Sequence, residues 1–226
     1  MKLRDSLYKP FKHWAEKGTI WVYSDPHFND YDCSLMDPDW PNPQTQIDLI
    51  NSKVHKNDTL IILGDVGDPY YIQKLNGYKV LLLGNHDKGA TNYMKSYTIL
   101  HANKAFSFFL DKEEAVEALD YLKAEGLYNL KLIDNNLFDE VYEGPLFIGQ
   151  KICLSHEPIK LNFGLNIHGH DHGDNPMDLH DGAESINVCA NIIGYTPIRL
   201  DKILTTYKTE TIHRQTIDKA VERKTF

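Results

Sequence analysis

The sequence predicts an α/β fold, in which short apolar strands alternate with helices along a single domain of residues 1–226. Three apolar runs end in a turn with a carboxylate: "TIWVYSD" (19–25), "TLIILGD" (59–65) and "KVLLLGNHD" (79–87). Between and after them, apolar residues recur at helical spacing. Strands that are apolar on both faces are typical of a sheet covered by helices on both sides, so we expect that arrangement here.

Two segments carry the clearest helical patterns, and Asp201 is a candidate cap for a short third helix, "KILTTYK" (202–208). In residues 42–58, Pro43 lies near the start, and Ile47, Ile50 and Val54 follow at helical spacing. Residues 111–126 carry a stronger signal, because Asp111 and Glu114 form a capping-box pattern before an apolar stripe. We therefore expect a helical insert around 101–126, whereas the polar C-terminal tail, 209–226, has no assigned structure.

The second half is richer in strand patterns. "FDEVYEG" (138–144) and "LFIGQKICLSH" (146–156) are predicted to form a hairpin joined at Gly144-Pro145. "LNIHGHDHGD" (165–174) follows as a strand that ends in alternating histidines.

Composition restricts the function classes. The 226 residues are 42% hydrophobic and 25% charged, with a formal net charge of -8, which argues against binding extended nucleic acid. No apolar run approaches the roughly 18 residues needed to span a membrane, and "MKLRDSLYKPFKHWAEKG" lacks the apolar core of a signal peptide. Cys33, Cys153 and Cys189 are widely spaced and odd in number. We therefore expect a cytoplasmic protein without membrane association, whose thiols belong to the core or are incidental.

Five apolar segments end in side chains that bind metals. In chain order these are Asp25 and His27; Asp65; Asn85, His86 and Asp87; His156; and His168, His170 and His172. In open α/β sheets, ligands bind outside the carboxyl ends of the strands. We therefore expect these side chains to meet at one rim.

The residue types indicate which ions fit. Side chains two apart in extended backbone point the same way, so Asp25 and His27 are expected to grip one ion. Mixed oxygen and nitrogen donors suit Mn, Fe or Zn better than Mg or Ca. The set exceeds the needs of one ion, which favours two ions about 3.5–4 Å apart, bridged by a carboxylate.

The blocks "DPH", "GD", "GNHD", "SHEP" and "GHDH", in that order from Asp25 to His172, resemble the pattern of the calcineurin-like metallophosphoesterase superfamily. The resemblance implies a four-layer α/β/β/α sandwich of two mixed sheets flanked by helices. It also implies a dinuclear-metal-dependent phosphoesterase that hydrolyses phosphate mono- or diesters by attack of a metal-bridging hydroxide.

By position, the resemblance implies a role for each residue. Asp65 would bridge the two metals, His86 would contact the phosphate or protonate the leaving group, and Asp87 would orient His86. The first metal would be held by Asp25, His27 and His172, and the second by Asn85, His156 and His170. Mn is the ion expected to support activity in vitro.

The residues "HGHDH" allow two registers, with His168 and His170 or His170 and His172 as ligands. We prefer the second register, because in the family pattern a Gly directly precedes the first ligand His. His168 would then lie behind the metal ligands or have a structural role.

Several residues near the motifs are candidates for substrate binding. Phe28, Trp40, Tyr70 and Tyr71 either stack a nucleobase or aryl leaving group, or pack the loops against the body. Lys88 either contacts a substrate phosphate or is a solvated loop residue.

The chain is acidic, without a basic stripe and with little Arg near the motifs, which favours a small phosphate ester or nucleotide as substrate. A phosphodiesterase is favoured over a protein phosphatase, and a homo-oligomer stays open. The alternative is a catalytically silent scaffold or protein-interaction subunit, as in superfamily members that have lost ligands. Here no expected ligand is missing, which argues against a scaffold.

Overall fold

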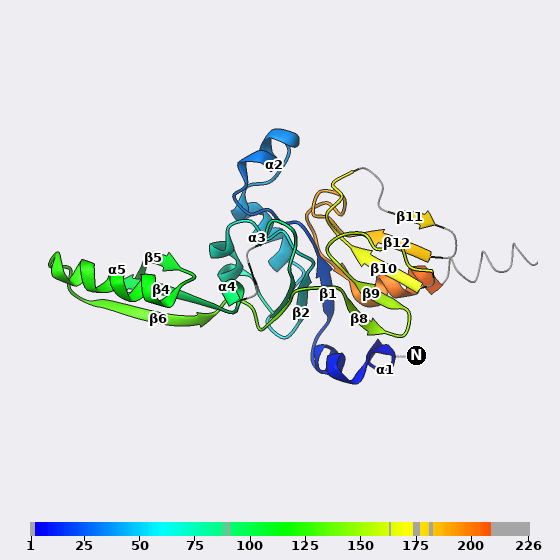
Figure 1. The fold of residues 1–226 in the computed structure, drawn as a ribbon, viewed down its shortest axis with the longest axis horizontal. Helices are drawn as coiled ribbons and strands as arrows, with labels where there is room; N and C mark the ends of the chain where they lie inside the picture. The colour runs from blue at the N-terminus through cyan, green and yellow to red at the C-terminus, as the bar shows by residue number, and fades with distance from the viewer. Residues whose placement is uncertain are drawn as a thin grey trace, which may run out of the picture.

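The computed structural model describes residues 3–87, 89, 91–162, 164–173, 177–180 and 183–208. The described residues form helices and three β-sheets, so the α/β class is confirmed (Figure 1). The first sheet has the strand order β13 (Ile198–Arg199), β1 (Ile20–Tyr23), β2 (Thr59–Ile62), β3 (Tyr78–Leu82) and β7 (Glu140–Tyr142). β1, β2, β3 and β7 run parallel, and β13 is antiparallel to β1.

The second sheet is also mixed. Its strand order is β11 (Met177–His180), β12 (Ala183–Asn187), β10 (Gly164–His168), β9 (Ile152–Leu154) and β8 (Leu146–Gly149). The central strands β12, β10 and β9 are parallel, whereas β11 and β8 pair antiparallel at the edges. The carboxyl ends of three parallel strands therefore meet at one edge of this sheet too.

Two apolar clusters occupy opposite faces of the first sheet. Val22 and Ile61 contribute to a cluster with Leu154 and Ile167 of the second sheet. Tyr23 of β1 belongs to a second cluster, on the other face of the sheet. This cluster also contains residues of β2 and β3 that point to that face, together with residues of α3 (Pro43–Asn51). Successive strand residues point to opposite faces, which explains why these strands are apolar throughout. The expectation of helices on both faces is wrong, because the second sheet covers one of them.

Apart from α5 and residues 200–208, the remaining helices have seven residues or fewer. They are α1 (Leu3–Ser6), η1 (Lys9–Ala15, a 3-10 helix), α2 (Tyr31–Met36), η2 (Pro69–Lys74, a 3-10 helix), α4 (Thr91–Met94) and α5 (Lys112–Ala124), and residues 200–208 are helical. Asn42 caps α3 by accepting from the backbone N–H of Thr45, and Pro43 opens the helix as predicted. The helix ends at Asn51, earlier than the pattern over 42–58 predicts. Within the described residues, no helix combines the length and apolar character needed to cross a bilayer.

The predicted hairpin at Gly144-Pro145 is wrong. β7 pairs parallel with β3 at the edge of the first sheet, and β8 pairs antiparallel with β9 in the second. The Gly-Pro step therefore carries the chain from one sheet to the other. Local pattern cannot separate these outcomes, because both place a strand on each side of a turn.

The predicted insert around 101–126 is larger than expected and mixed in structure. α5 begins after Asp111, which accepts from the backbone N–H groups of Glu113 and Glu114. The helix accompanies a three-stranded antiparallel sheet of β5 (Lys104–Phe109), β4 (Lys95–His101) and β6 (Leu130–Asn136). Figure 1 shows this unit, which we call the arm, extending away from the two larger sheets. The tail 209–226 lies outside the described residues.

Candidate metal centre

The motif loops of both sheets meet at one place. The backbone N–H of Asp25, after β1, donates to the carbonyl of Gly64, after β2. Nδ1 of His156, after β9 in the second sheet, lies 2.8 Å from the carbonyl oxygen of Leu63. Because parallel strands end on the same edge, packing the two sheets together brings the five predicted segments to a common rim.

The backbone at this rim differs from the extended form expected for Asp25 and His27. Asp25, His27, Asp65 and His170 adopt positive φ values of 54°, 39°, 52° and 68°. Non-glycine residues rarely adopt this conformation, which costs roughly 1–3 kcal/mol each and is concentrated at functional sites. Asp25 and His27 therefore converge through two left-handed turns and not through strand alternation.

The first donor cluster contains Asp25, His27 and Asp65, each of which offers one atom within 4.8 Å of the others. Nε2 of His27 lies 3.6 Å from Oδ2 of Asp65 and 4.0 Å from Oδ1 of Asp25. Nε2 of His172 lies 3.5 Å from the same Asp25 oxygen. These four residues include all three predicted for the first metal, together with the predicted bridge.

The second donor cluster contains Asp65, His156 and His170. Nε2 of His156 lies 3.4 Å from Oδ2 of Asp65 and 3.2 Å from Nδ1 of His170. Oδ1 of Asn85 lies 2.7 Å from this His156 nitrogen and 3.0 Å from Nδ1 of His170. Oδ2 of Asp65 thus faces a nitrogen of each cluster and joins the two.

The donor set fits divalent cations. Asp25 is fully buried, and its Oδ1 has no hydrogen-bond partner among the described residues. A buried carboxylate oxygen without a partner is costly unless a cation or donor satisfies it. This oxygen faces Nε2 of both His27 and His172, and such a mixed N/O environment suits Mn, Fe or Zn.

Two motif glycines allow the carboxylates to approach the backbone. A Cβ atom on Gly84 would lie less than 3.0 Å from Oδ1 of Asp65, and one on Gly169 less than 3.0 Å from Oδ2 of Asp25. Side chains at these positions would displace the two acids. The glycines of "GNHD" and "GHDH" are therefore required by close packing around the donor clusters.

Asp65 and His156 shift the pKa of each other in opposite directions. Burial lowers the pKa of His156, but contacts with Asp65 and Asp25 outweigh it and raise the pKa to about 9. Burial raises the pKa of Asp65, but contact with His156 outweighs it and leaves that pKa below its usual value. A metal ion would have to displace the His156 proton, so metal affinity depends on pH.

His86 and Asp87 have different environments. His86 is exposed, its ring centroid is 5.6 Å from that of His27, and its backbone N–H donates to Asp65 Oδ1. Asp87 Oδ2 accepts from the backbone N–H groups of Asp65 and Gly84, and its Oδ1 accepts from the backbone N–H of Val66. The predicted role of Asp87 in orienting His86 is therefore corrected, because this carboxylate holds the "GD" and "GNHD" loops together.

The three alternating histidines separate in the structure. His170 and His172 face the donor clusters, whereas His168 ends β10, is buried, and has its Nδ1 2.8 Å from the carbonyl oxygen of Gly169. The structure thus places the preferred pair, and not His168, beside Asp65 and Asp25.

The candidate substrate residues are dispersed. Phe28 is fully buried in the cluster with α3, and its ring lies 5.9 Å from Tyr71, so of its two alternatives the structure favours packing over substrate contact. Tyr70 packs edge-on against Phe108 of the arm. Trp40 remains at the rim, with ring centroids 6.2 Å from His27 and 5.7 Å from His172. Lys88 lies outside the described residues.

Two residues at the rim were missed by sequence reasoning. Sγ of Cys189, a thiol expected to belong to the core or to be incidental, lies 3.2 Å from Oδ2 of Asp25. No local motif marks Cys189, since it arrives through the second sheet. Oδ2 of Asp30 lies 3.0 Å from Nδ1 of His27. The sequence could have indicated Asp30, because an acid three residues after His27 at the start of a helix can reach the imidazole ring.

No family model and no curated protein matches this chain. A crystal structure of a protein of unknown function from Aquifex aeolicus is similar, with a TM-score of 0.51 and 23% identity. The likeness covers 83% of this chain and 98% of that chain. It shows a shared fold, and no activity follows from it.

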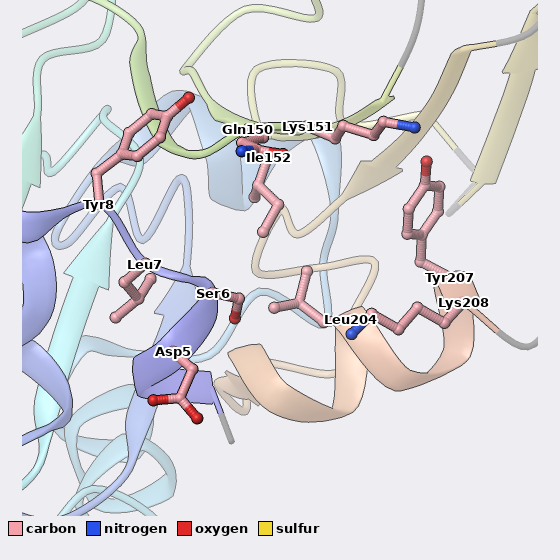
Figure 2. Close-up of a pocket in the computed structure, with 10 residues that line it drawn as sticks. All are labelled: Asp5, Ser6, Leu7, Tyr8, Gln150, Lys151, Ile152, Leu204, Tyr207 and Lys208. Carbon is pink, nitrogen blue, oxygen red and sulfur yellow. The ribbon is translucent and has the colours of Figure 1, made fainter. Parts of the chain in front are cut away.

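A cavity of about 330 Å³ adjoins the second donor cluster, where it is lined by Asn85 and His156. The crossover between β7 and β8, at Gly144 and Pro145, forms another wall. Figure 2 shows a different cavity, of about 400 Å³, beside α1 and residues 200–208. That cavity is lined by Ile152, at the opposite end of β9 from His156, and by none of the predicted site residues.

Proposed function

We propose that this chain is a calcineurin-like metallophosphoesterase that binds two divalent metal ions and hydrolyses small phosphate esters. The observation that carries the proposal is Oδ2 of Asp65, which lies 3.6 Å from Nε2 of His27 and 3.4 Å from Nε2 of His156. One carboxylate oxygen shared by two donor clusters is the arrangement that a pair of adjacent cations requires.

The finer fold belongs to the same proposal. The first apolar cluster joins the faces of two mixed five-stranded sheets, and α3 packs on the outer face of the first. These contacts support a four-layer α/β/β/α sandwich. The carboxyl ends of both sets of parallel strands then form one edge, which is where the donor clusters lie.

Each residue has a role under this proposal. Asp25, His27 and His172 would hold one ion, Asn85, His156 and His170 the other, and Asp65 both. When bound, two such ions supply positive charge to the phosphoryl oxygens and lower the pKa of water. His86, exposed beside His27, is placed to contact the phosphoryl group or to give a proton to the leaving oxygen.

We favour a phosphodiester of a small molecule or nucleotide as substrate, and Mn as the ion that supports activity. The cavity beside Asn85 and His156, about 330 Å³, suits the organic group of a small ester. The net charge of -8 disfavours long nucleic acid.

The test is hydrolysis of bis-p-nitrophenyl phosphate with added Mn²⁺, with the bound metal measured by mass spectrometry. We expect two ions per chain and turnover, and we expect Asp65→Asn to lose both. Asp120→Asn, on the exposed face of the arm helix, is the matched control and keeps wild-type behaviour. If no divalent ion supports turnover of this diester or of p-nitrophenyl phosphate, the proposed function is wrong.

A further inference from the structure

Asp30 connects a predicted metal ligand to the beginning of a helix. Its Oδ1 accepts from the backbone N–H of Asp32 at 2.9 Å, which caps α2. Its Oδ2 lies 3.0 Å from Nδ1 of His27. Oδ1 of Asp30 therefore caps α2, and Oδ2 contacts His27. The capping contact holds Oδ2 in place against the imidazole ring.

The contact between Asp30 and His27 determines which ring nitrogen carries the proton and which has the lone pair that can bind a metal. Asp30 at this position is an acceptor only, so Nδ1 carries the proton and donates to it. In the neutral ring the lone pair is then on Nε2, which faces Asp25 Oδ1 and Asp65 Oδ2. A carboxylate behind a metal-binding imidazole fixes the tautomer and raises the basicity of the nitrogen that binds the metal.

Among the described residues, no hydrogen bond places an acid behind His156 in the other cluster. Nδ1 of His156 lies 2.8 Å from the neutral carbonyl oxygen of Leu63. A carbonyl fixes the tautomer as a carboxylate does, but it brings no negative charge. The two clusters therefore differ in the support of their histidines.

We propose that Asp30 is a positioning residue that selectively strengthens cation binding at the cluster of Asp25, His27 and His172, so that the two metal sites have unequal affinities. The inference rests on the proposed metal centre, but it does not require that the centre hydrolyse any ester. Removal of Asp30 would weaken one site and leave the other unchanged.

The fluorescence of Trp40 can report metal binding at the cluster of Asp25, His27 and His172. Its ring lies 6.2 Å from the ring of His27 and 5.7 Å from that of His172. The other two tryptophans contact distant acids, because Nε1 of Trp14 donates to Glu140 and Nε1 of Trp21 donates to Asp58. Quenching of Trp40 fluorescence by Co²⁺ is thus expected to be stronger from this cluster than from the other, and Trp40→Phe identifies the component that Trp40 contributes.

The variants separate capping from the contact with His27. Asp30→Ser keeps a good N-cap for α2 but is too short to reach Nδ1 of His27. Asp30→Asn also caps, and its amide group favours a proton on the wrong nitrogen of His27. Asp32→Asn is the matched control, because it removes an acid from the same helix without a contact to His27.

The experiment titrates metal-free protein with Co²⁺ and follows both Trp40 fluorescence and the total bound metal. In Asp30→Ser and Asp30→Asn, we expect the affinity reported by Trp40 to fall by roughly 10- to 100-fold, with the second ion bound as in wild type. Asp32→Asn should match wild type. Unchanged quenching in both Asp30 variants, equal weakening of both sites, or wild-type protein that binds no Co²⁺ would each overturn the inference. Two bound ions with the expected shift, but no ester hydrolysis, would refute the proposed function and leave this inference standing.

Discussion

Oδ2 of Asp65 lies 3.4 Å from Nε2 of His156, although the two residues follow strands of different sheets. Asp65 comes after β2 in the first sheet, and His156 comes after β9 in the second. The second donor cluster thus exists only when the two sheets are packed together, and His172 reaches the first cluster from the second sheet in the same way. Substitutions of candidate metal ligands are therefore expected to change metal binding. Substitutions of residues that hold the loops or strands in place are expected to change the stability of the fold.

His172 and His168 are expected to respond differently to substitution. His172→Ala should lower metal affinity by more than the roughly 10- to 100-fold typical of residues behind the ligands, because its Nε2 faces Asp25. His168→Ala should keep metal binding but lower the melting temperature, since His168 is buried in β10. Bound metal and thermal unfolding measure the two effects. Intact metal content and activity in His172→Ala, with loss of both in His168→Ala, would show that the register is wrong.

His86→Ala is expected to impair hydrolysis without loss of metal. The His86 ring is exposed beside His27 and belongs to neither donor cluster. A residue that assists proton transfer contributes roughly 100- to 10,000-fold, so kcat should fall by that factor at unchanged metal content. Steady-state kinetics and metal analysis on the same preparation test this. An unchanged kcat would exclude His86 from the reaction.

Asp87→Asn is expected to act on stability. The carboxylate accepts from the backbone N–H groups of Asp65, Val66 and Gly84. The side chain of Asn would place its NH2 group, which is itself a donor, against at least one of these N–H groups. Leaving one such N–H without a partner costs roughly 1–3 kcal/mol. Urea unfolding in the presence of a chelator should show this loss, because no metal then contributes. A variant with wild-type stability and a specific loss of kcat would instead restore the role in orienting His86.

Glu140 should make stability depend on pH far from the rim. It accepts from Nε1 of Trp14 at 3.0 Å and from the hydroxyl of Tyr78 at 2.9 Å, and its other oxygen accepts from the hydroxyl of Tyr142. Burial raises the pKa of Glu140, but these donors and His13 outweigh it and leave the pKa below its usual value. A lowered folded-state pKa stabilises the protein above the unfolded-state pKa of about 4.3, and the contribution is lost as pH falls through the folded value.

Glu140→Gln should therefore be less stable than wild type near pH 7, by about 1 kcal/mol for a partly exposed carboxylate, with the difference shrinking below about pH 4. Unfolding free energies measured from pH 7 to pH 3 test this prediction. Glu143→Gln, three residues further along the chain and exposed, is the matched control. A difference from wild type that stays constant over the whole range would contradict the assignment to ionised Glu140.

Sequence reasoning was accurate where local pattern sufficed. The strand ends at Asp25, Asp65 and Asn85 follow from short apolar runs that stop at a turn, and parallel strands end on the same edge. The capped helix after Asp111 is equally local, since its cap involves residues two and three positions away. Such features depend on neighbours along the chain, and the sequence shows them directly.

The errors arose where distant segments decide the outcome. The sequence left Phe28 open between a substrate contact and the core, and its ring packs beside Tyr71 in the core. Asp87 looked like a partner for His86 because the two are adjacent, but its acceptors face backbone groups of the loop after β2. In both cases the side chain is directed by a segment more than twenty residues away.

The order and types of the candidate donors, from Asp25 to His172, were readable from the amino acids alone, because residue type and strand ends are local properties. The tertiary structure alone decided that β7 and β8 belong to different sheets, and that Cys189 reaches Asp25. It also decided that Asp65 stands between His27 and His156. These relationships depend on how two sheets bury a shared apolar face, and no periodicity along one strand encodes which distant strand will cover it.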